Sequence, residues 1–247
     1  MRVCIGIICI GQTYLRDFEA TFKPSVIKYA ERHGYDLKIF TDFLDFNHKH
    51  PDSISFQKCL VPQTVSEYDV VVIMDADIWI SDSAPPIPHC EKIGIVNEAA
   101  QLSSDVHGLE NFLSSPAKYY SLAGFSLETD KILNTGFIVC RPTHHAKFLA
   151  DVYAKYIDAS ANHPRKFHYE QACIGYELQL QSQFELLPNQ WNSIYVFYTY
   201  LNMRISGVYC LHFAGLPASI RATELRRYLT TQRHQGGIRR RVGQERL

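Results

Sequence analysis

The feature that most constrains the fold of this chain is a series of short apolar runs separated by helix-like stretches. Residues 2–10 and 69–74 are almost wholly apolar and rich in β-branched side chains, which is typical of strands buried on both faces. Further strand candidates lie at 37–40, 93–96, 136–140, 184–187 and 208–213. Helix candidates lie at 24–32, 56–68 (where Pro62 should interrupt the helix), 144–157 and 168–180. This alternation predicts an α/β fold with a mostly parallel central sheet flanked by helices.

The charge of the chain is balanced overall but unevenly distributed. Lys+Arg and Asp+Glu are both 25, so the formal net charge is zero and gives no reason to expect a nucleic-acid partner. Residues 221–247 contain eight Arg and two Glu, whereas the first 220 residues are mildly acidic. We therefore expect one domain at 1–220 and a basic tail at 221–247. The tail is either a peripheral contact to an anionic membrane surface or a solvated, frayed end.

The cysteines and the apolar runs predict a location. The chain has seven cysteines, an odd number, and no C-x-x-C pair, which predicts free thiols in a reducing, cytoplasmic compartment without a zinc site. The first apolar run lacks a small-residue cleavage site, so it is interpreted as a strand rather than as a signal peptide. No apolar run reaches about 18 residues, and no membrane span is expected.

The strongest local motif is an Asp-x-Asp directly after the apolar run that ends at Met74. Asp75 and Asp77 are one residue apart, so on an extended chain their side chains point the same way and could share one cation. Ligands of open α/β sheets bind at the carboxyl ends of strands, and carboxylate oxygens suit Mg²⁺ or Mn²⁺. The same tripeptide is also common in turns and helix caps, but its place after a buried strand favours a functional site.

Three weaker motifs follow along the chain. Asn134-Thr135-Gly136 precedes an apolar run, Glu170-Gln171 lies at a predicted helix start, and His212 ends the last predicted strand. An amide can bond hydroxyl groups, and a neutral imidazole can complete a metal site begun by two carboxylates. Taken singly, each of the three is also explained by an ordinary turn, a solvated helix start or a structural histidine.

The order and spacing of the four motifs resemble those of GT-A glycosyltransferases. The nearest likeness is to the retaining group around glycosyltransferase family 8, of the glycogenin and bacterial lipopolysaccharide galactosyltransferase type. The resemblance runs from about residue 2 to residue 215 and implies the Rossmann-like GT-A fold. It departs from the family in two places: Glu170 stands where Asp is usual, and no Gly-Lys-Pro-Trp-like sequence follows the late histidine.

The resemblance implies a metal and nucleotide site. It assigns Asp75, Asp77 and His212 as ligands of Mn²⁺ (or Mg²⁺) on the diphosphate of a UDP-sugar, with Ala76 beside it. It places Lys58 against the nucleotide or the donor sugar, although a surface lysine is an equal alternative. It also suggests nucleotide contacts at Ile10, Gly11, Tyr14 and Gly215.

The resemblance further implies the residues around the reacting sugar. Asn134 would meet the donor sugar or the acceptor, and Glu170 and Gln171 would lie beside the anomeric centre. Gln171 would orient that centre, and a nucleophilic Glu170 stays open in principle.

The function expected from this set is metal-dependent transfer of a hexose, galactose or glucose, from a UDP-sugar to a hydroxyl group with retention. The acceptor would be a saccharide, a lipid-linked group or a protein. A haloacid dehalogenase-type phosphatase would place its Asp-x-Asp on the first strand. The alternatives kept open are a sugar nucleotidyltransferase, for which the segment after the first strand is poor in Gly and basic residues, and a non-catalytic sugar-nucleotide-binding module.

Two other segments are candidates for substrate contacts. A tyrosine-rich run, Tyr195, Tyr198 and Tyr200, lines either an acceptor groove or the edge of the core. Trp191 and Asn192 are expected within reach of the acceptor. Residues 99–126 have the Ser, Gly and Tyr content of a lid that closes over the donor.

Overall fold

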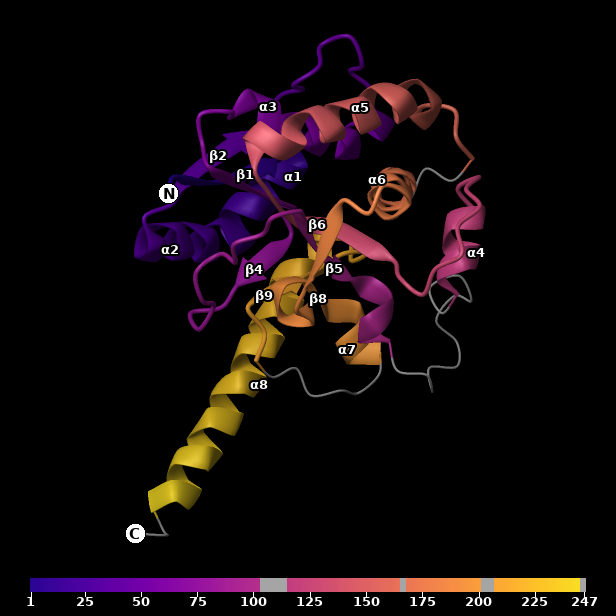
Figure 1. The fold of residues 1–247 in the computed structure, drawn as a ribbon. Helices are drawn as coiled ribbons and strands as arrows, with labels where there is room; N and C mark the ends of the chain where they lie inside the picture. Colours follow the sequence, from indigo (N-terminus) through magenta and orange to yellow (C-terminus); the bar gives the residue numbers. More distant parts are fainter. Residues whose placement is uncertain (103–114, 165–167, 201–206, 245–247) are drawn as a thin grey trace. The chain divides into compact units, whose positions relative to one another are not determined.

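Two β-sheets and the helices around them form the larger of two units in the computed structural model. The structure describes residues 1–102, 115–164, 168–200 and 207–244. The first unit is Met1–Ala214 and the second is Gly215–Leu247. The larger sheet has six strands in the order β2-β1-β3-β6-β5-β7, and the smaller has three in the order β4-β9-β8 (Figure 1).

The strands are β1 (Val3–Ile8), β2 (Asp36–Phe40), β3 (Val70–Met74), β4 (Ile78–Ile80), β5 (Ile93–Asn97), β6 (Leu133–Cys140), β7 (Phe184–Leu187), β8 (Ser193–Ile194) and β9 (Cys210–His212). The α-helices are α1 (Gln12–Asp17), α2 (Lys23–His33), α3 (Val61–Thr64), α4 (Pro116–Ser121), α5 (Pro142–Ser160), α6 (Tyr169–Leu180), α7 (Tyr195–Tyr200) and α8 (Ala218–Gln244). The remaining turns are a π-helix, η1 (Phe18–Phe22), and the 3₁₀ helices η2 (Pro51–Ser53), η3 (Ser55–Leu60), η4 (Glu98–Gln101) and η5 (Asn189–Asn192).

The larger sheet is mixed and mostly parallel, as the sequence predicts. β1 runs parallel to β2 and β3, and β5 runs parallel to β7. β6 is antiparallel to both of its neighbours, β3 and β5. All five residues of β3 are buried, which explains why this central strand is a continuous run of Val, Ile and Met.

The strand predicted at 136–140 begins earlier than expected. β6 starts at Leu133, so Asn134 lies inside the strand rather than in a turn before it. The pairing with β5 explains the difference, because Asn134 lies opposite Val96 beyond an irregularity at Ile95/Val96. The polar side chains of this motif are therefore held rigidly by the sheet.

The helix predicted at 56–68 is also different. It forms as the 3₁₀ helix η3 followed by the single turn α3, and Pro62 lies in the first turn of α3. A proline has no N–H to give to a helical bond, so the break falls where the sequence places it. The predicted helix 24–32 is confirmed within α2, which ends at His33 and is followed by Gly34 in the left-handed conformation, φ 66°.

The main hydrophobic core lies on the face of the larger sheet that α5, α6 and η3 cover. Helix α5 packs against η3, α3 and α6, and α6 packs against β6 (Figure 1). The core includes Phe56, Ile73, Ile138 and Leu149. α2 packs instead against β2, β4 and η1.

The cysteines and the second unit have simple descriptions. All seven cysteines are buried and free.

The second unit consists of a short turn that begins at Gly215 and the long helix α8. Over the residues that the structure describes, no helix combines the length and apolar character that crossing a bilayer requires.

Candidate metal site and adjoining cavity

The Asp-x-Asp segment connects the two sheets. It leaves β3 at Met74 and enters β4 at Ile78. The N–H of Asp75 donates to the carbonyl of Gly136 at 2.8 Å, and the carbonyl of Asp77 accepts the N–H of Phe213 at 2.9 Å. Backbone bonds thus fix the segment at both ends.

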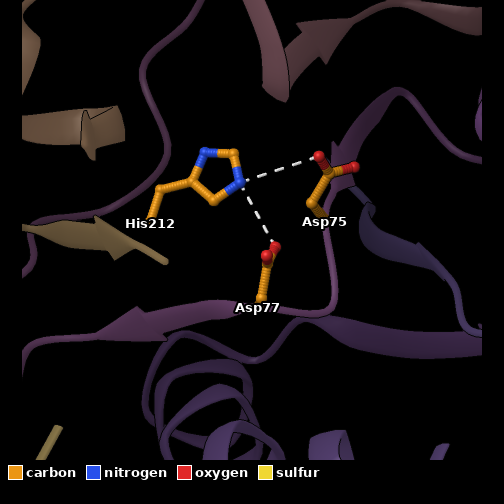
Figure 2. A group of neighbouring side chains, drawn as sticks. All are labelled: Asp75, Asp77 and His212. Atoms are coloured by element: carbon orange, nitrogen blue, oxygen red, sulfur yellow. Dashed lines mark ion pairs between the residues drawn. The ribbon is translucent and has the colours of Figure 1, made fainter. Parts of the chain in front are cut away.

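The smaller sheet brings the late histidine to the same place. In the antiparallel pair of β4 and β9, His212 lies opposite Ile78, and Ile78 is the residue that follows Asp77. His212 Nε2 lies 3.2 Å from Asp77 Oδ1 and 3.8 Å from Asp75 Oδ2. Figure 2 shows one ring nitrogen facing both carboxylates. One ligand atom from each of the three residues lies within 4.8 Å of the others.

This group of Asp75, Asp77 and His212 fits a divalent cation. Two carboxylates and an imidazole are ligands that Mn²⁺ and Mg²⁺ accept, and Asp77 and His212 are buried. Burial lowers the pKa of His212, but the carboxylates of Asp77 and Asp75 outweigh it and raise the pKa above its ordinary value. The three groups therefore favour a positive charge between them, which a proton or a metal ion can supply.

A buried lysine lies on the other side of Asp75. Lys58 Nζ lies 2.8 Å from Asp75 Oδ1 and 3.2 Å from Glu170 Oε1, and it donates to the carbonyl of Thr135 at 3.2 Å. Burial disfavours its ammonium group, yet the carboxylates of Asp75 and Glu170 raise the pKa of Lys58. Lys58 is thus a fixed cation that holds Asp75 by one oxygen while the other oxygen faces His212.

Glu170 and Gln171 lie in the first turn of α6, and their side chains reach different parts of the site. Burial raises the pKa of the Glu170 carboxyl, with Lys58 opposing the shift. Gln171 Nε2 donates to Glu98 Oε2 and to the hydroxyl of Tyr119, both at 3.0 Å. The adjacent motif residues therefore enter two separate polar clusters, one around Lys58 and one around Glu98.

Glu98 is a buried site residue that sequence reasoning missed. It follows directly after β5 and is 3% exposed. Its Oε2 accepts Asn134 Nδ2 at 2.6 Å in addition to Gln171 Nε2. Asn97 separates Glu98 from the apolar run 93–96, so the sequence gives Glu98 a weaker signal than Asp75, and its buried partners appear only in the folded chain.

The aromatic segment before His212 packs in the interior. The ring of Trp191 stacks on Phe137 with centroids 5.4 Å apart, and Tyr195 stacks on Phe213 at 4.6 Å. Tyr195 therefore packs at the edge of the core, and Trp191 is buried as well. Asn192 is fully buried, and its Oδ1 lies 2.9 Å from His212 Nδ1. The side chain of Tyr200 lies outside the described residues.

A cavity of about 420 Å³ adjoins the metal group, a volume in the range of small-ligand sites. Asp75, Lys58 and Glu170 form its polar wall, and Ile10 and Tyr14 belong to its apolar part. The rest of the lining consists of Ile8, Pro51, Asp52, Ile54 and Ser55, which the sequence did not indicate.

The other predicted contact residues have varied positions. Gly11 is exposed beside the cavity-lining Ile10 and has φ 102°, a conformation that favours glycine. Ala76 is buried between the two aspartates. Gly215 belongs to the second unit. Residues 103–114 of the predicted lid lie outside the described residues.

One histidine, His48, fastens the loop that precedes the cavity-lining Pro51 to helix α5. His48 Nδ1 lies 2.8 Å from Asp45 Oδ2, and its Nε2 lies 2.9 Å from Asp158 Oδ1 on α5. Hydrogen bonds to Asp45 and Asp158 raise the pKa of His48. The hydroxyl of Tyr153 also donates to Asp45, at 2.9 Å.

We expect His48 to stabilise the fold in a pH-dependent way. Its folded-state pKa is raised, so its contribution is complete below the unfolded value of about 6.5 and is lost as the pH rises through the folded-state pKa. His48→Ala should lower the melting temperature more at pH 6 than at pH 9. Because the ion pair is accessible to solvent, the loss in the free energy of unfolding at pH 6 should be at most about 1 kcal/mol. Equal losses at both pH values would contradict the charged pairing.

Gly136 makes room for the ring of His212. A Cβ at this position would lie 2.3 Å from His212 Cε1 and 2.6 Å from His212 Nδ1. We expect Gly136→Ala to displace the ring, to weaken Mn²⁺ binding at least about tenfold, and to cost about 1–3 kcal/mol of stability.

Gly94→Ala is the matched control for this substitution. Its Cβ would lie 2.6 Å from Cys90 Sγ, so it overpacks β5 without touching His212. Mn²⁺ titration and urea unfolding of both variants separate the two effects. An unchanged Mn²⁺ affinity in folded Gly136→Ala would show that the space beside the ring is not needed.

The fold of this chain matches solved structures of GT-A glycosyltransferases. A glycosyltransferase involved in glycosylation of the major capsid of PBCV-1 superposes with a TM-score of 0.59 at 15% identity, over 90% of this chain and 98% of the other. The galactosyltransferase LgtC, in complex with donor and acceptor sugar analogs, superposes with a TM-score of 0.59 at 9% identity, over 86% of this chain and 87% of the other.

A third structure, the bifunctional glycosyltransferase WbbM, gives a TM-score of 0.51 at 15% identity, over 87% of this chain and 46% of the other. The sequence matches no protein-family model and no curated protein sequence. At these identities the structural likeness establishes the fold.

Proposed function

We propose that the chain is a metal-dependent glycosyltransferase that moves a hexose, galactose or glucose, from a UDP-sugar to a hydroxyl acceptor with retention of configuration. The observation that supports this most is the group of Asp75, Asp77 and His212, the last two of them buried, at the edge of a cavity that Lys58 and Glu170 also line. The acceptor would be a saccharide, a lipid-linked group or a protein.

The cavity offers the complements of a nucleoside diphosphate. Its apolar part has the ring of Tyr14 and the side chain of Ile10, on which a base can stack. Its polar wall has Asp75 and the ammonium group of Lys58, close to where a diphosphate must lie to reach the metal ligands. A divalent cation held there, Mn²⁺ or Mg²⁺, would neutralise the charge that develops on the leaving diphosphate.

The residues of α6 and β6 would act on the sugar. Gln171 and Asn134 are held by Glu98, so their amides are fixed before any substrate enters. Preorganised dipoles of this kind stabilise charge at the reacting centre without reorganisation. Glu170, paired with Lys58 at 3.2 Å, would keep the donor-side charge balanced.

Release of UDP from candidate donors tests this function. The full chain is incubated with UDP-glucose or UDP-galactose, with Mn²⁺ or with a chelator, and UDP and free hexose are measured. We expect Mn²⁺-dependent release, with the α anomer of the hexose appearing first as retention requires. A UDP-sugar that is bound but never cleaved would favour the binding module, and pyrophosphate exchange would favour a nucleotidyltransferase.

The proposal includes a peripheral membrane contact by the basic tail and a cytoplasmic location of the enzyme. An enzyme with a lipid-linked acceptor would gain from a tail of net charge +6, since residues 221–247 contain eight Arg and two Glu. Removal of these residues should then reduce binding to anionic vesicles while leaving UDP binding intact. The free cysteines are consistent with a cytoplasmic enzyme.

A further inference from the structure

A row of buried amide groups connects the backbone of β6 to the ring of His212. Asn134 Oδ1 accepts the N–H of Gly136 at 2.9 Å, and Asn134 Nδ2 donates to Glu98 Oε2 at 2.6 Å. A backbone N–H can only donate a hydrogen bond. The oxygen end of the Asn134 amide must therefore face Gly136, and its NH₂ end must face Glu98.

The orientation of Asn134 determines that of the next amide, Asn192. The two side chains meet at 2.6 Å, between Asn192 Nδ2 and Asn134 Oδ1. An amide oxygen needs a donor opposite it, so the NH₂ end of Asn192 faces Asn134. Asn192 Oδ1 is then directed at His212 Nδ1, which lies 2.9 Å away.

The orientation of Asn192 in turn selects one protonation pattern of the imidazole. An amide oxygen can only accept, so His212 Nδ1 must carry a hydrogen. The other ring nitrogen, Nε2, is the atom that faces Asp75 and Asp77. A histidine that ligates a metal ordinarily donates its second N–H to a neighbour, and that bond fixes both the tautomer and the ring angle.

We propose that Asn192, oriented by Asn134, is a positioning residue that holds hydrogen on His212 Nδ1 and presents Nε2 to the cation. This goes beyond the acceptor contact that the sequence suggested for Asn192, whose side chain is fully buried. The use of the cation rests on the proposed function, whereas the orientation of the ring does not. Gly136 contributes twice, since its N–H orients Asn134 and its missing side chain leaves room for the ring.

Mn²⁺ binding to the full-length Asn192→Leu variant tests the proposal. Leucine has a similar volume but offers no acceptor to His212 Nδ1. Asn189→Ala is the matched control, because Asn189 begins the same short helix η5 and its half-buried side chain donates to the carbonyl of Ala100 at 3.4 Å rather than to His212. With free Mn²⁺ measured by electron paramagnetic resonance, we expect binding to weaken about 10–100-fold in Asn192→Leu and to stay within about twofold in Asn189→Ala.

Nitrogen NMR of the imidazole supplies a readout that a general loss of stability would not mimic. In ¹⁵N-labelled, metal-free wild type we expect a slowly exchanging Nδ1–H signal of His212, assigned by its absence in His212→Gln. The signal should persist when Mg²⁺ is added and should be lost or exchange rapidly in Asn192→Leu.

The outcomes separate the positioning role from the proposed function. If Asn192→Leu is folded and binds Mn²⁺ as wild type does, or if the wild-type ring lacks the Nδ1–H, the proposal is overturned. If Asn192→Leu does not fold, the wild-type spectrum with Mg²⁺ decides, because a doubly protonated, metal-free ring carries the Nδ1–H whatever Asn192 does. If wild type itself binds no Mn²⁺, the proposed function fails, and the Nδ1–H signal still decides how Asn192 orients the ring.

Discussion

Replacing Asp77 with asparagine is expected to lower turnover of a UDP-sugar about a thousandfold. Asp77 is buried, and its Oδ1 is 3.2 Å from His212 Nε2, so the asparagine removes a negative charge from the centre of the metal group. Charge stabilisation by a bound cation amounts to several kcal/mol, and about 4 kcal/mol corresponds to a factor of roughly 10³ in rate.

Asp82→Asn is the control for this substitution. Asp82 is an exposed aspartate that pairs with Lys28 at 2.8 Å, so the change removes an equal charge outside the site. Turnover should stay within about twofold of wild type, in line with the small energies of exposed ion pairs. If folded Asp77→Asn keeps more than about a tenth of the wild-type rate with Mn²⁺ present, the metal group does not have the role proposed for it.

Replacing Lys58 with methionine is expected to cause the largest loss of stability among the site variants, about 3–5 kcal/mol in the free energy of unfolding. Lys58 lies between two carboxylates, those of Asp75 and Glu170, and is 5% exposed. Removing it leaves negative charge buried without its partner. Because burial already raises the pKa of Glu170, this residue can take up a proton, so the loss should be smaller at acid than at alkaline pH.

A double variant separates charge from packing in this prediction. Lys58→Met with Glu170→Gln also removes one of the two carboxylates that lose their lysine partner, and we expect it to recover about half of the lost stability in urea unfolding. Each single variant and the double variant together form a cycle that measures the coupling. A Lys58→Met protein as stable as wild type would show that the buried ammonium group is not a structural counter-ion.

The parts of the fold that the sequence predicted are those set by local pattern. The apolar run of β3, the proline and glycine around α2 and the Asp-x-Asp after Met74 each depend on a few neighbouring residues. Burial on both faces requires apolar side chains at every position of a strand, and this requirement is visible in the sequence without knowledge of its partners.

The parts that the sequence did not predict depend on pairing between distant segments. The start of β6 at Leu133 follows from its register with β5, and the position of His212 follows from its pairing with Ile78 in a second sheet. The role of Gly136 in leaving room for the ring becomes visible only once that sheet is formed. No local pattern encodes these distances.

The candidate site divides in the same way. Asp75, Asp77 and His212 were expected together and lie together, although their role as ligands is still a prediction. Glu98 and the positioning contact of Asn192 were missed because each acts through a buried hydrogen bond to a residue at least 20 positions away. Polar residues in the interior are explained by their partners, and the partners appear only in the folded chain.

The most direct test of the account is calorimetric titration of UDP into the full chain with and without Mn²⁺. The account predicts binding that is at least about tenfold tighter with Mn²⁺, because the cavity and the group of Asp75, Asp77 and His212 would bind one diphosphate together. The enhancement should disappear in Asp77→Asn and persist in Asp82→Asn. Equal affinity with and without the metal, or no binding of UDP in the presence of Mn²⁺, would contradict the central claim.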